Sequence, residues 1–286
     1  MISVVVCSKG QPGSIFTDNI RNTIGCDYEL IVIGNSDRKY GICEAYNMGA
    51  RQSNFNLLVF VHEDVIFHSF NWGNILHQLA GNNNIGIIGC AGCVFKSGYP
   101  TAWVDVPEKY YRTNVIDGWN EEKKKNNHGY SGADIADVAV LDGMFLCMRK
   151  TVWQQFPFNE DELKGFHLYD LDICIRAGAS YRNIVSYNIL TEHLSAGDFN
   201  ESWFRESIRF HEKWKAQLPK TITTLSPGEE KDIQYYSLVK CVQHYLSFHL
   251  KGKDLLKYII KLFLYRPLSG YNLKLLKGFI KNSFQV

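Results

Sequence analysis

Residues 57–67 read LLVFVHEDVIF, in which five apolar residues precede His62, Glu63 and Asp64 and three more follow them. An unbroken apolar run of this length is typical of a strand that is buried on both faces, as the strands of parallel sheets are. Ligands of open α/β sheets bind beyond the carboxyl ends of the strands. The stretch therefore indicates a buried strand with a candidate binding site directly after it.

The first 90 residues repeat this alternation of short apolar runs with segments of helical periodicity. We expect helices at 14–24 and 41–52, and strands at 2–7, 29–33, 57–62 and within 84–95. Strands that alternate with helices build βαβ units around a parallel sheet. The sequence therefore predicts an α/β fold of the Rossmann-like kind, with a mainly parallel central sheet flanked by helices.

Polar residues also end the first two predicted strands, where Ser8 closes the first and Asn35 and Asp37 follow the second. A divalent ion that bridges a diphosphate needs one or two protein carboxylates, because phosphate and water supply its other ligands. Asp64 and His62 can face one such ion, since alternate residues of an extended segment point the same way. The alternative is a set of polar turns, in which Asp64, Asn35 and Asp37 only shape the backbone.

The composition fits a folded intracellular protein. With 286 residues, 45% of them hydrophobic, the chain can bury a large core. Several of its eight cysteines lie in apolar runs, where free thiols are common, so we expect a reducing, cytoplasmic compartment. Cys90 and Cys93 lack the second ligand pair of a zinc site. Neither a signal peptide nor an apolar stretch of roughly 18 residues, as a spanning helix needs, is found.

Residues 96–134 form an unusually long connection rich in Gly, Tyr, Trp, Asn and Lys, which is typical of a functional loop. Its aromatic residues either stack on sugar faces or bury against the domain; they are Trp103, Tyr110, Tyr111, Trp119 and Tyr130. Its lysine run, 123–125, has no nucleic-acid-binding motif around it, so no nucleic-acid partner is expected. Beyond the loop we expect an apolar segment at 136–148, a helix at 169–177, a strand at 181–190 and a helix at 200–216.

The end of the chain is basic, with 11 Lys and Arg against 4 acidic residues from Lys220 onward. We expect a boundary near residue 220, between a main domain at 1–219 and a helical C-terminal extension at 220–286. Lysines recur at every fourth residue of one predicted helix, at 253, 257 and 261, with apolar residues on its other side. Such a helix either packs on the main domain or makes a peripheral contact with a membrane surface or a partner.

In order and spacing, the segments resemble the family 2 inverting glycosyltransferases and their relatives of bacterial capsule biosynthesis. The first half carries the resemblance in SVVVCSKG (3–10), ELIVIGNSD (29–37), GICEAYNMGARQ (41–52) and LLVFVHEDV (57–65). The second half carries it in VLDGMFLCMRK (140–150), FPFNEDELKGF (156–166), YDLDICIRAG (169–178) and TEHLSAG (191–197). The resemblance covers about residues 1–200 and leaves the tail unexplained.

The resemblance implies a GT-A fold and transfer of a sugar, with inversion, from a nucleoside-diphosphate sugar to a saccharide or lipid-linked acceptor. It implies Mn²⁺ or Mg²⁺ as the cofactor and UDP as the first candidate nucleotide. Asp170 is the implied catalytic base. The implied metal ligands are Asp64, His62 and His193. The implied nucleotide contacts are Ser8, Asn35, Asp37, Asn47 and Glu63, and the implied sugar or acceptor contacts are Asp142, Gly143 and Asp172.

Two residues depart from the family pattern. His62 stands where the family has the first Asp of its Asp-x-Asp motif, and Tyr169 stands where it has a Glu beside the base. Imidazole binds manganese-like ions, although carboxylates suit hard cations better. Asp170 also suits the first turn of a helix without any substrate.

Two other functions remain open from the sequence. One is a catalytically inactive protein that still binds nucleotide or saccharide, which the His62 substitution permits and the retained Asp170 disfavours. The other, a nucleotidyltransferase, ranks last because the sequence has no Gly-rich phosphate loop.

Overall fold

The computed structural model describes residues 1–119, 121–250 and 253–284, and the chain divides into two compact units. Unit 1 comprises residues 1–94 and 109–197, and unit 2 comprises residues 95–108 and 198–286. The expected boundary at residue 220 therefore falls inside unit 2. The physical reason is α6 (Glu201–Trp214), whose Trp203 and Phe204 share one hydrophobic core with the C-terminal helices.

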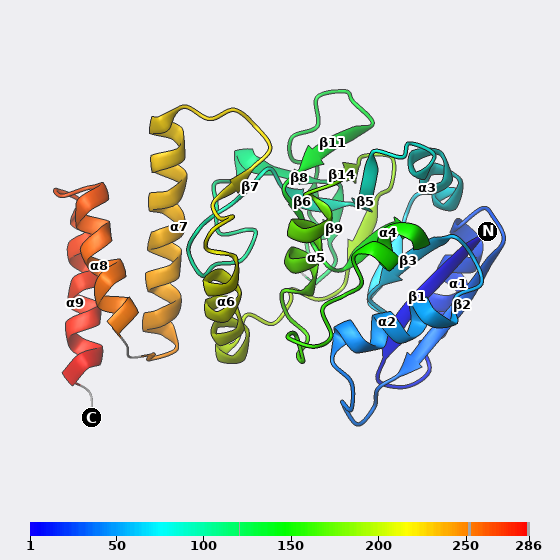
Figure 1. The fold of residues 1–286 in the computed structure, drawn as a ribbon, viewed down its shortest axis with the longest axis horizontal. Helices are drawn as coiled ribbons and strands as arrows, with labels where there is room; N and C mark the ends of the chain where they lie inside the picture. Colours follow the sequence, from blue (N-terminus) through cyan, green and yellow to red (C-terminus); the bar gives the residue numbers. More distant parts are fainter. Residues whose placement is uncertain (120, 251–252, 285–286) are drawn as a thin grey trace. The chain divides into compact units, whose positions relative to one another are not determined.

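Unit 1 is built on a seven-stranded sheet in the order β11-β14-β5-β13-β3-β1-β2 (Figure 1). The strands are β1 (Ile2–Ser8), β2 (Tyr28–Gly34), β3 (Leu57–Val61), β5 (Ile85–Gly89), β11 (Ile135–Val138), β13 (Phe145–Arg149) and β14 (Arg182–Ser186). β13 and β11 run antiparallel to their neighbours, and the other strands share one direction. The predicted α/β class with a mainly parallel central sheet is confirmed, while the antiparallel β13 in its middle was not expected.

Helices cover this sheet. They are α1 (Ser14–Thr23), α2 (Ile42–Gln52), α3 (Trp72–Ala80), α4 (Lys150–Gln155) and α5 (Tyr169–Ala177). α2 packs on β1 and β2, α3 on β5 and β13, and α5 on β5 and β14. In α2, a Cβ atom on Gly49 would lie 2.2 Å from Val5 Cγ1, so the helix approaches β1 this closely only because that residue is a glycine.

Short strands complete unit 1. They are β4 (Val65–Phe67), β6 (Ala91–Cys93), β8 (Tyr111–Thr113), β9 (Val115–Asp117), β10 (Lys125–Asn126), β12 (Val140–Leu141) and β15 (Thr191–His193), with a 3₁₀ turn, η1, at Glu108–Tyr110. They form two small sheets, β10-β9-β15-β4 and β12-β6-β8. The segment expected as one long loop is thus divided: residues 95–108 belong to unit 2, and the rest belongs to unit 1, where it contributes β8, β9 and β10 to these small sheets. All eight cysteines are free thiols, as expected.

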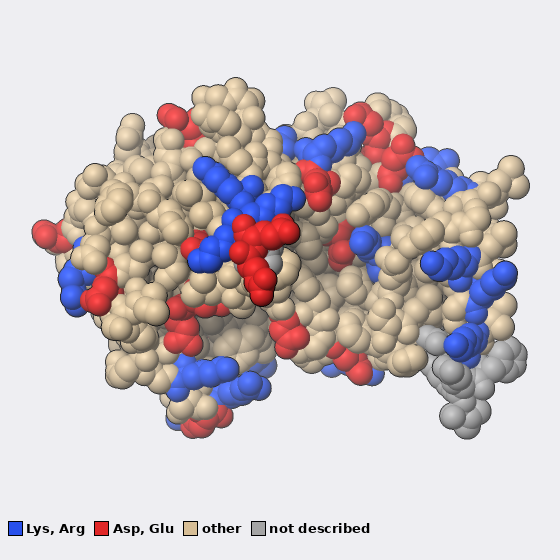
Figure 2. All heavy atoms as spheres, turned by 180° about the vertical axis from the view of Figure 1, so that it is seen from behind, with Lys and Arg blue, Asp and Glu red and all other residues tan. Residues whose placement is uncertain are grey.

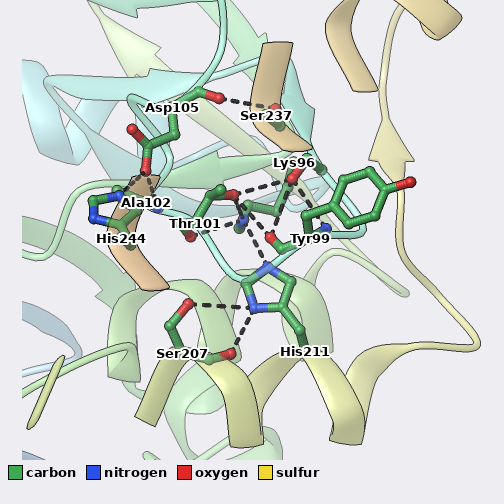
Figure 3. Close-up of polar contacts among 10 residues, drawn as sticks. Lys96, Tyr99, Thr101, Ala102, Asp105, Ser207, His211, Ser237 and His244 are labelled. Atoms are coloured by element: carbon green, nitrogen blue, oxygen red, sulfur yellow. Dashed lines mark hydrogen bonds and ion pairs between the residues drawn. The ribbon is translucent and has the colours of Figure 1, made fainter. Parts of the chain in front are cut away.

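Unit 2 contains α6, α7 (Pro227–Ser247), α8 (Lys253–Tyr265) and α9 (Gly270–Phe284), and a strand pair, β7 (Phe95–Lys96) with β16 (Lys220–Thr221). Figure 3 shows its buried polar contacts. Lys96 Nζ lies 3.0 Å from Thr101 O and 2.9 Å from His211 Nε2, and His244 Nε2 lies 3.1 Å from Asp105 Oδ2. Within the described ranges, no helix combines the length and the apolar character needed to cross a bilayer.

Candidate active site

The ends of three neighbouring strands bring the first predicted site residues together. Ser8 at the end of β1 pairs with Gly34 at the end of β2, and the Asn35 amide donates to Ser8 O over 2.7 Å. The Ser8 hydroxyl donates to the Glu63 carboxylate, which follows β3. The expected meeting of polar residues at this sheet edge is therefore present, because β1 lies between the other two strands.

His62, Asp64 and His193 converge on one point. Their ligand atoms all lie within 4.8 Å of one another, and His193 Nε2 is 3.5 Å from Asp64 Oδ1. A tight turn after β3, closed by Val65 N donating to His62 O over 3.3 Å, places the first two side chains. β15 adds the third, because it pairs with β4 so that His193 lies opposite Val65. Two segments that are distant in sequence thus supply one possible metal site.

The surroundings shift the pKa of each of the three triad side chains. Burial lowers the pKa of His62, so its imidazole is neutral near pH 7. Burial alone would raise the pKa of Asp64, but hydrogen bonds from His193 and Ser195 outweigh it and lower that pKa below its ordinary value. Burial alone would lower the pKa of His193, but its hydrogen bond to Asp64 and the Asp142 carboxylate outweigh burial and raise that pKa. Because neutral imidazoles and a carboxylate are the metal-binding forms of these groups, a divalent ion would compete with a proton at His193. Two nitrogen ligands and one oxygen ligand fit Mn²⁺ better than Mg²⁺, which prefers oxygen.

The two residues that depart from the family pattern touch each other. His62 Nε2 lies 2.7 Å from Tyr169 Oη, and the Tyr169 hydroxyl donates to Gly143 O over 2.9 Å. In the sequence these are two separate departures, and their hydrogen bond is apparent only in the structure.

Asp170 lies in the first turn of α5, directly after two residues that shape the approach to the helix. Leu168, before Tyr169, has a left-handed backbone with φ 62°, an unusual conformation for a residue with a side chain. Asp170 Oδ2 accepts from Gly143 N over 3.0 Å, and Oδ1 accepts from Leu171 N over 2.9 Å. Burial, together with the nearby Asp142 carboxylate, raises the pKa of Asp170 to about 7. That value suits a group that exchanges a proton near neutral pH.

Asn35 and Asp37 shape their own loop. The Asn35 side chain donates to Tyr40 O over 2.8 Å and accepts from Tyr40 N over 2.9 Å. Asp37 is exposed and accepts from Lys39 N over 3.3 Å. The turn-forming roles considered from the sequence are therefore present, and the exposed Asp37 carboxylate keeps an open side toward a ligand.

Asn47 and Asp172 are buried and make their contacts within the chain. Asn47 Oδ1 accepts from Trp153 Nε1 and Phe158 N, and its Nδ2 donates to Phe158 O over 2.8 Å. Asp172 forms an ion pair of 2.8 Å with Arg176. Both residues hold the polypeptide around the site, and a nucleotide contact of Asn47 and an acceptor contact of Asp172 stay predictions.

Among the aromatic residues of the connection, Trp119 is 52% exposed and follows Gly118, whose amide donates to His193 O over 2.9 Å. Tyr110, by contrast, is buried. The pairing of β9 with β15 thus brings Gly118 to His193 of the triad, and the exposed Trp119 indole follows directly in the sequence.

Comparisons with known proteins agree with this architecture. A family model described as "glycosyltransferase like family" matches residues 13–213. No curated protein matches the sequence. The chain is similar to S. aureus TarS 1–349 in complex with UDP-GlcNAc, with 11% identity and a TM-score of 0.51 over 98% of this chain and 88% of that one.

A second similar structure is GalNAc-T7 with UDP, GalNAc and Mn²⁺, with 10% identity and a TM-score of 0.51 over 96% of this chain and 57% of that one. At these identities the likeness establishes the fold, which is that of the GT-A glycosyltransferases.

Proposed function

This chain belongs to the glycosyltransferase-like family, and from that premise we propose that it moves a sugar from a nucleoside-diphosphate sugar to a saccharide or lipid-linked acceptor. The observation that carries the proposal is the convergence of His62, Asp64 and His193 at the carboxyl end of β3. Two of the similar structures are complexes with UDP or a UDP-sugar, which makes UDP the first nucleotide to test. Assembly of a bacterial capsule or surface polysaccharide is the pathway class that we propose.

The donor side consists of residues at the ends of β1, β2 and β3. In this proposal Ser8, Glu63, Asn35 and Asp37 contact the nucleotide, and the triad holds Mn²⁺ or, less favourably, Mg²⁺. When bound, the ion supplies Lewis-acid stabilisation of the leaving diphosphate.

Asp170 is the proposed base. The acceptor oxygen forms a bond to the anomeric carbon while the bond from that carbon to the diphosphate oxygen breaks, and Asp170 takes the proton of the acceptor hydroxyl. Attack from the face opposite the leaving group inverts the configuration. Asp142 and Gly143 lie beside the base and are the proposed sugar or acceptor contacts, with the exposed Trp119 as a surface on which a sugar can stack.

A calorimetric titration of UDP and GDP, each with and without Mn²⁺, tests the donor site. We expect Mn²⁺-dependent binding to wild-type protein and its loss in Asp64→Ala. Asp161→Ala, which removes an exposed carboxylate on the same unit, is the matched control. Binding of nucleotide without turnover of any offered acceptor would favour the inactive alternative, and no binding of either nucleotide would contradict the proposal.

The C-terminal helices suggest the second partner, a membrane surface. In α8, Leu255, Ile259 and Leu262 are buried in the unit 2 core, while a second apolar row remains 48–74% exposed: Leu256, Ile260 and Leu264. The apolar residues of this helix, expected on one side, are therefore divided between a buried and an exposed face.

Basic side chains flank this exposed row. Lys257 is exposed on α8, and α9 has the same pattern, with exposed Leu273 and Ile280 beside Lys274, Lys277 and Lys281. Figure 2 shows blue Lys and Arg side chains among tan ones at its right-hand end, where α8 and α9 lie. Contiguous exposed apolar surface marks interaction sites, and flanking lysines favour anionic lipid. We therefore propose that this face of unit 2 binds an anionic bilayer peripherally.

A further inference from the structure

We infer that Tyr169 is a positioning residue for His62, whose imidazole it holds in the tautomer with the proton on Nε2, so that Nδ1 remains for the divalent ion. The metal-binding part of this inference rests on the proposed function. The tautomer itself is a property of the protein without metal or nucleotide.

The hydrogen-bond geometry allows one assignment. A phenol has a single proton, and a carbonyl oxygen can only accept. At 2.9 Å from Gly143 O, the Tyr169 hydroxyl donates that proton to the carbonyl. Toward His62 Nε2, at 2.7 Å, the same oxygen can therefore only accept, so Nε2 carries a proton. A neutral imidazole protonated on Nε2 has its lone pair on Nδ1.

The surroundings hold the hydroxyl in place. Tyr169 is buried, and its ring packs against Tyr46 and Phe158 at centroid distances of 5.7 and 6.0 Å. A Cβ atom on Gly143 would lie 2.2 Å from Tyr169 Oη, so the hydroxyl reaches the carbonyl only because residue 143 is a glycine.

Gly143 also connects this arrangement to the base. Its carbonyl accepts from Tyr169, while its amide donates to Asp170 Oδ2 over 3.0 Å. One residue thus orients the partner of a metal ligand and the carboxylate that takes the proton. Hydrogen-bonded partners of this kind set the orientation and basicity of ligating histidines. This explains how an imidazole at residue 62 can serve where the family pattern has a carboxylate.

The first test is nitrogen-15 NMR of histidine-labelled, metal-free protein, with the His62 signals assigned from the spectrum of His62→Gln. We expect the Nε2–H tautomer alone in the wild type and a mixture of tautomers in Tyr169→Phe. Tyr187→Phe is the matched control, since it removes a tyrosine hydroxyl of the same unit that also donates to a backbone carbonyl, His128 O, over 2.9 Å.

The second test is Mn²⁺ binding, followed by electron paramagnetic resonance of the free ion. We expect affinity to fall about 10- to 100-fold in Tyr169→Phe, as for other lost partners of metal ligands, and to remain unchanged in Tyr187→Phe. An Nδ1–H tautomer in the wild type, or unchanged Mn²⁺ affinity in Tyr169→Phe, would overturn the inference.

The two proposals fail in different ways. If neither UDP nor GDP binds, while the His62 tautomer and the Mn²⁺ affinities are as expected, the proposed function is wrong and this inference is still supported. Absence of Mn²⁺ binding to the wild type would overturn the metal-positioning role. If Tyr169→Phe does not fold, the wild-type tautomer alone decides, because the opposite tautomer is incompatible with the donor count.

Discussion

Asp170 accepts two backbone hydrogen bonds, which favour its charged form, yet burial and the Asp142 carboxylate outweigh them and raise its pKa to about 7. A base must be deprotonated to accept a proton, so its active fraction decreases as the pH falls through this value. The residue that the family resemblance selected therefore also has a physical property that a solvated carboxylate lacks.

We predict that kcat for sugar transfer declines below about pH 7, approaching tenfold per pH unit once Asp170 is mostly protonated. Asp170→Asn should lower kcat about 10²- to 10⁴-fold, because the amide cannot accept the proton, with UDP binding retained. Steady-state rates between pH 5 and 9 check this, with Asp161→Asn as the control for a generic carboxylate loss. A flat profile in the wild type would exclude Asp170 as the titrating base.

Gly143 provides a stability prediction at the same scale. In Gly143→Ala the new methyl group would overlap the Tyr169 hydroxyl, and the contact cannot relax without breaking two of the hydrogen bonds around it. We expect the free energy of unfolding to fall by about 1–3 kcal/mol, as for other overpacked sites. Urea denaturation measures it. Gly228→Ala, where a Cβ would meet nothing within 4 Å, should be neutral or slightly stabilising, and equal losses in both variants would refute the overlap.

At the scale of elements, a hydrogen bond between Lys96 and His211 joins β7 to α6, and no sequence motif singles out either residue. Lys96 Nζ approaches His211 Nε2 at 2.9 Å, while His211 Nδ1 lies 2.7 Å from Ser207 O (Figure 3). The Nδ1 proton is donated to that carbonyl, so Nε2 accepts from the ammonium. Burial, with the Lys96 charge, lowers the pKa of His211 well below its ordinary value. The imidazole is therefore neutral in the folded unit.

This makes the stability of unit 2 sensitive to acid. Below the unfolded histidine pKa of about 6.5 the unfolded chain binds a proton that the folded chain excludes, so stability is fully present above that pH and is lost as pH falls. We predict that the free energy of unfolding decreases by up to about 1.4 kcal/mol per pH unit from His211 between pH 6 and 5.

The measurement is urea denaturation at pH 7, 6 and 5, comparing wild type with His211→Gln, whose amide oxygen can still accept from Lys96. The variant should show a shallower loss of stability toward pH 5. His249→Gln, which replaces an exposed histidine of the same unit, controls for a general histidine effect. Identical slopes for the wild type and His211→Gln would contradict the role of His211.

For the molecule as a whole, lipid binding and sugar transfer are proposed for different units. The exposed apolar residues belong to α8 and α9 of unit 2, and the triad belongs to unit 1. Each exposed apolar side chain adds to affinity by leaving water, and the lysines add an attraction to anionic lipid that salt screens.

We predict that the wild type floats with vesicles containing phosphatidylserine but not with phosphatidylcholine vesicles, and that 0.5 M salt weakens binding. Replacing Leu256, Ile260 and Leu264 by serine should reduce the membrane partition coefficient at least about tenfold, since roughly 1.4 kcal/mol corresponds to that factor. Ile15→Ser with Phe70→Ser, which removes similarly exposed apolar side chains from unit 1, is the control. Self-association through this face without vesicle binding would identify a second copy as the partner instead.

The sequence by itself determined the fold class and several elements of unit 1. Strands and helices with strong local periodicity, such as β1, α2 and α5, begin and end within a few residues of the prediction, because buried strands and amphipathic helices leave their period in the sequence. The polar residues after β1, β2 and β3 were found the same way, since parallel strands bring their carboxyl ends to one edge. Asp170 and His193 needed the family resemblance.

Only the tertiary structure decided what these residues contact. The antiparallel insertion of β13, the pairing of β15 with β4, and the assignment of α6 to unit 2 depend on contacts between distant segments, which local periodicity does not encode. For the same reason His62 and Tyr169, 107 residues apart, read as two unrelated substitutions in the sequence and form one hydrogen bond in the fold. The chemistry of a side chain follows from its residue type, but the groups that it contacts depend on how distant segments pack.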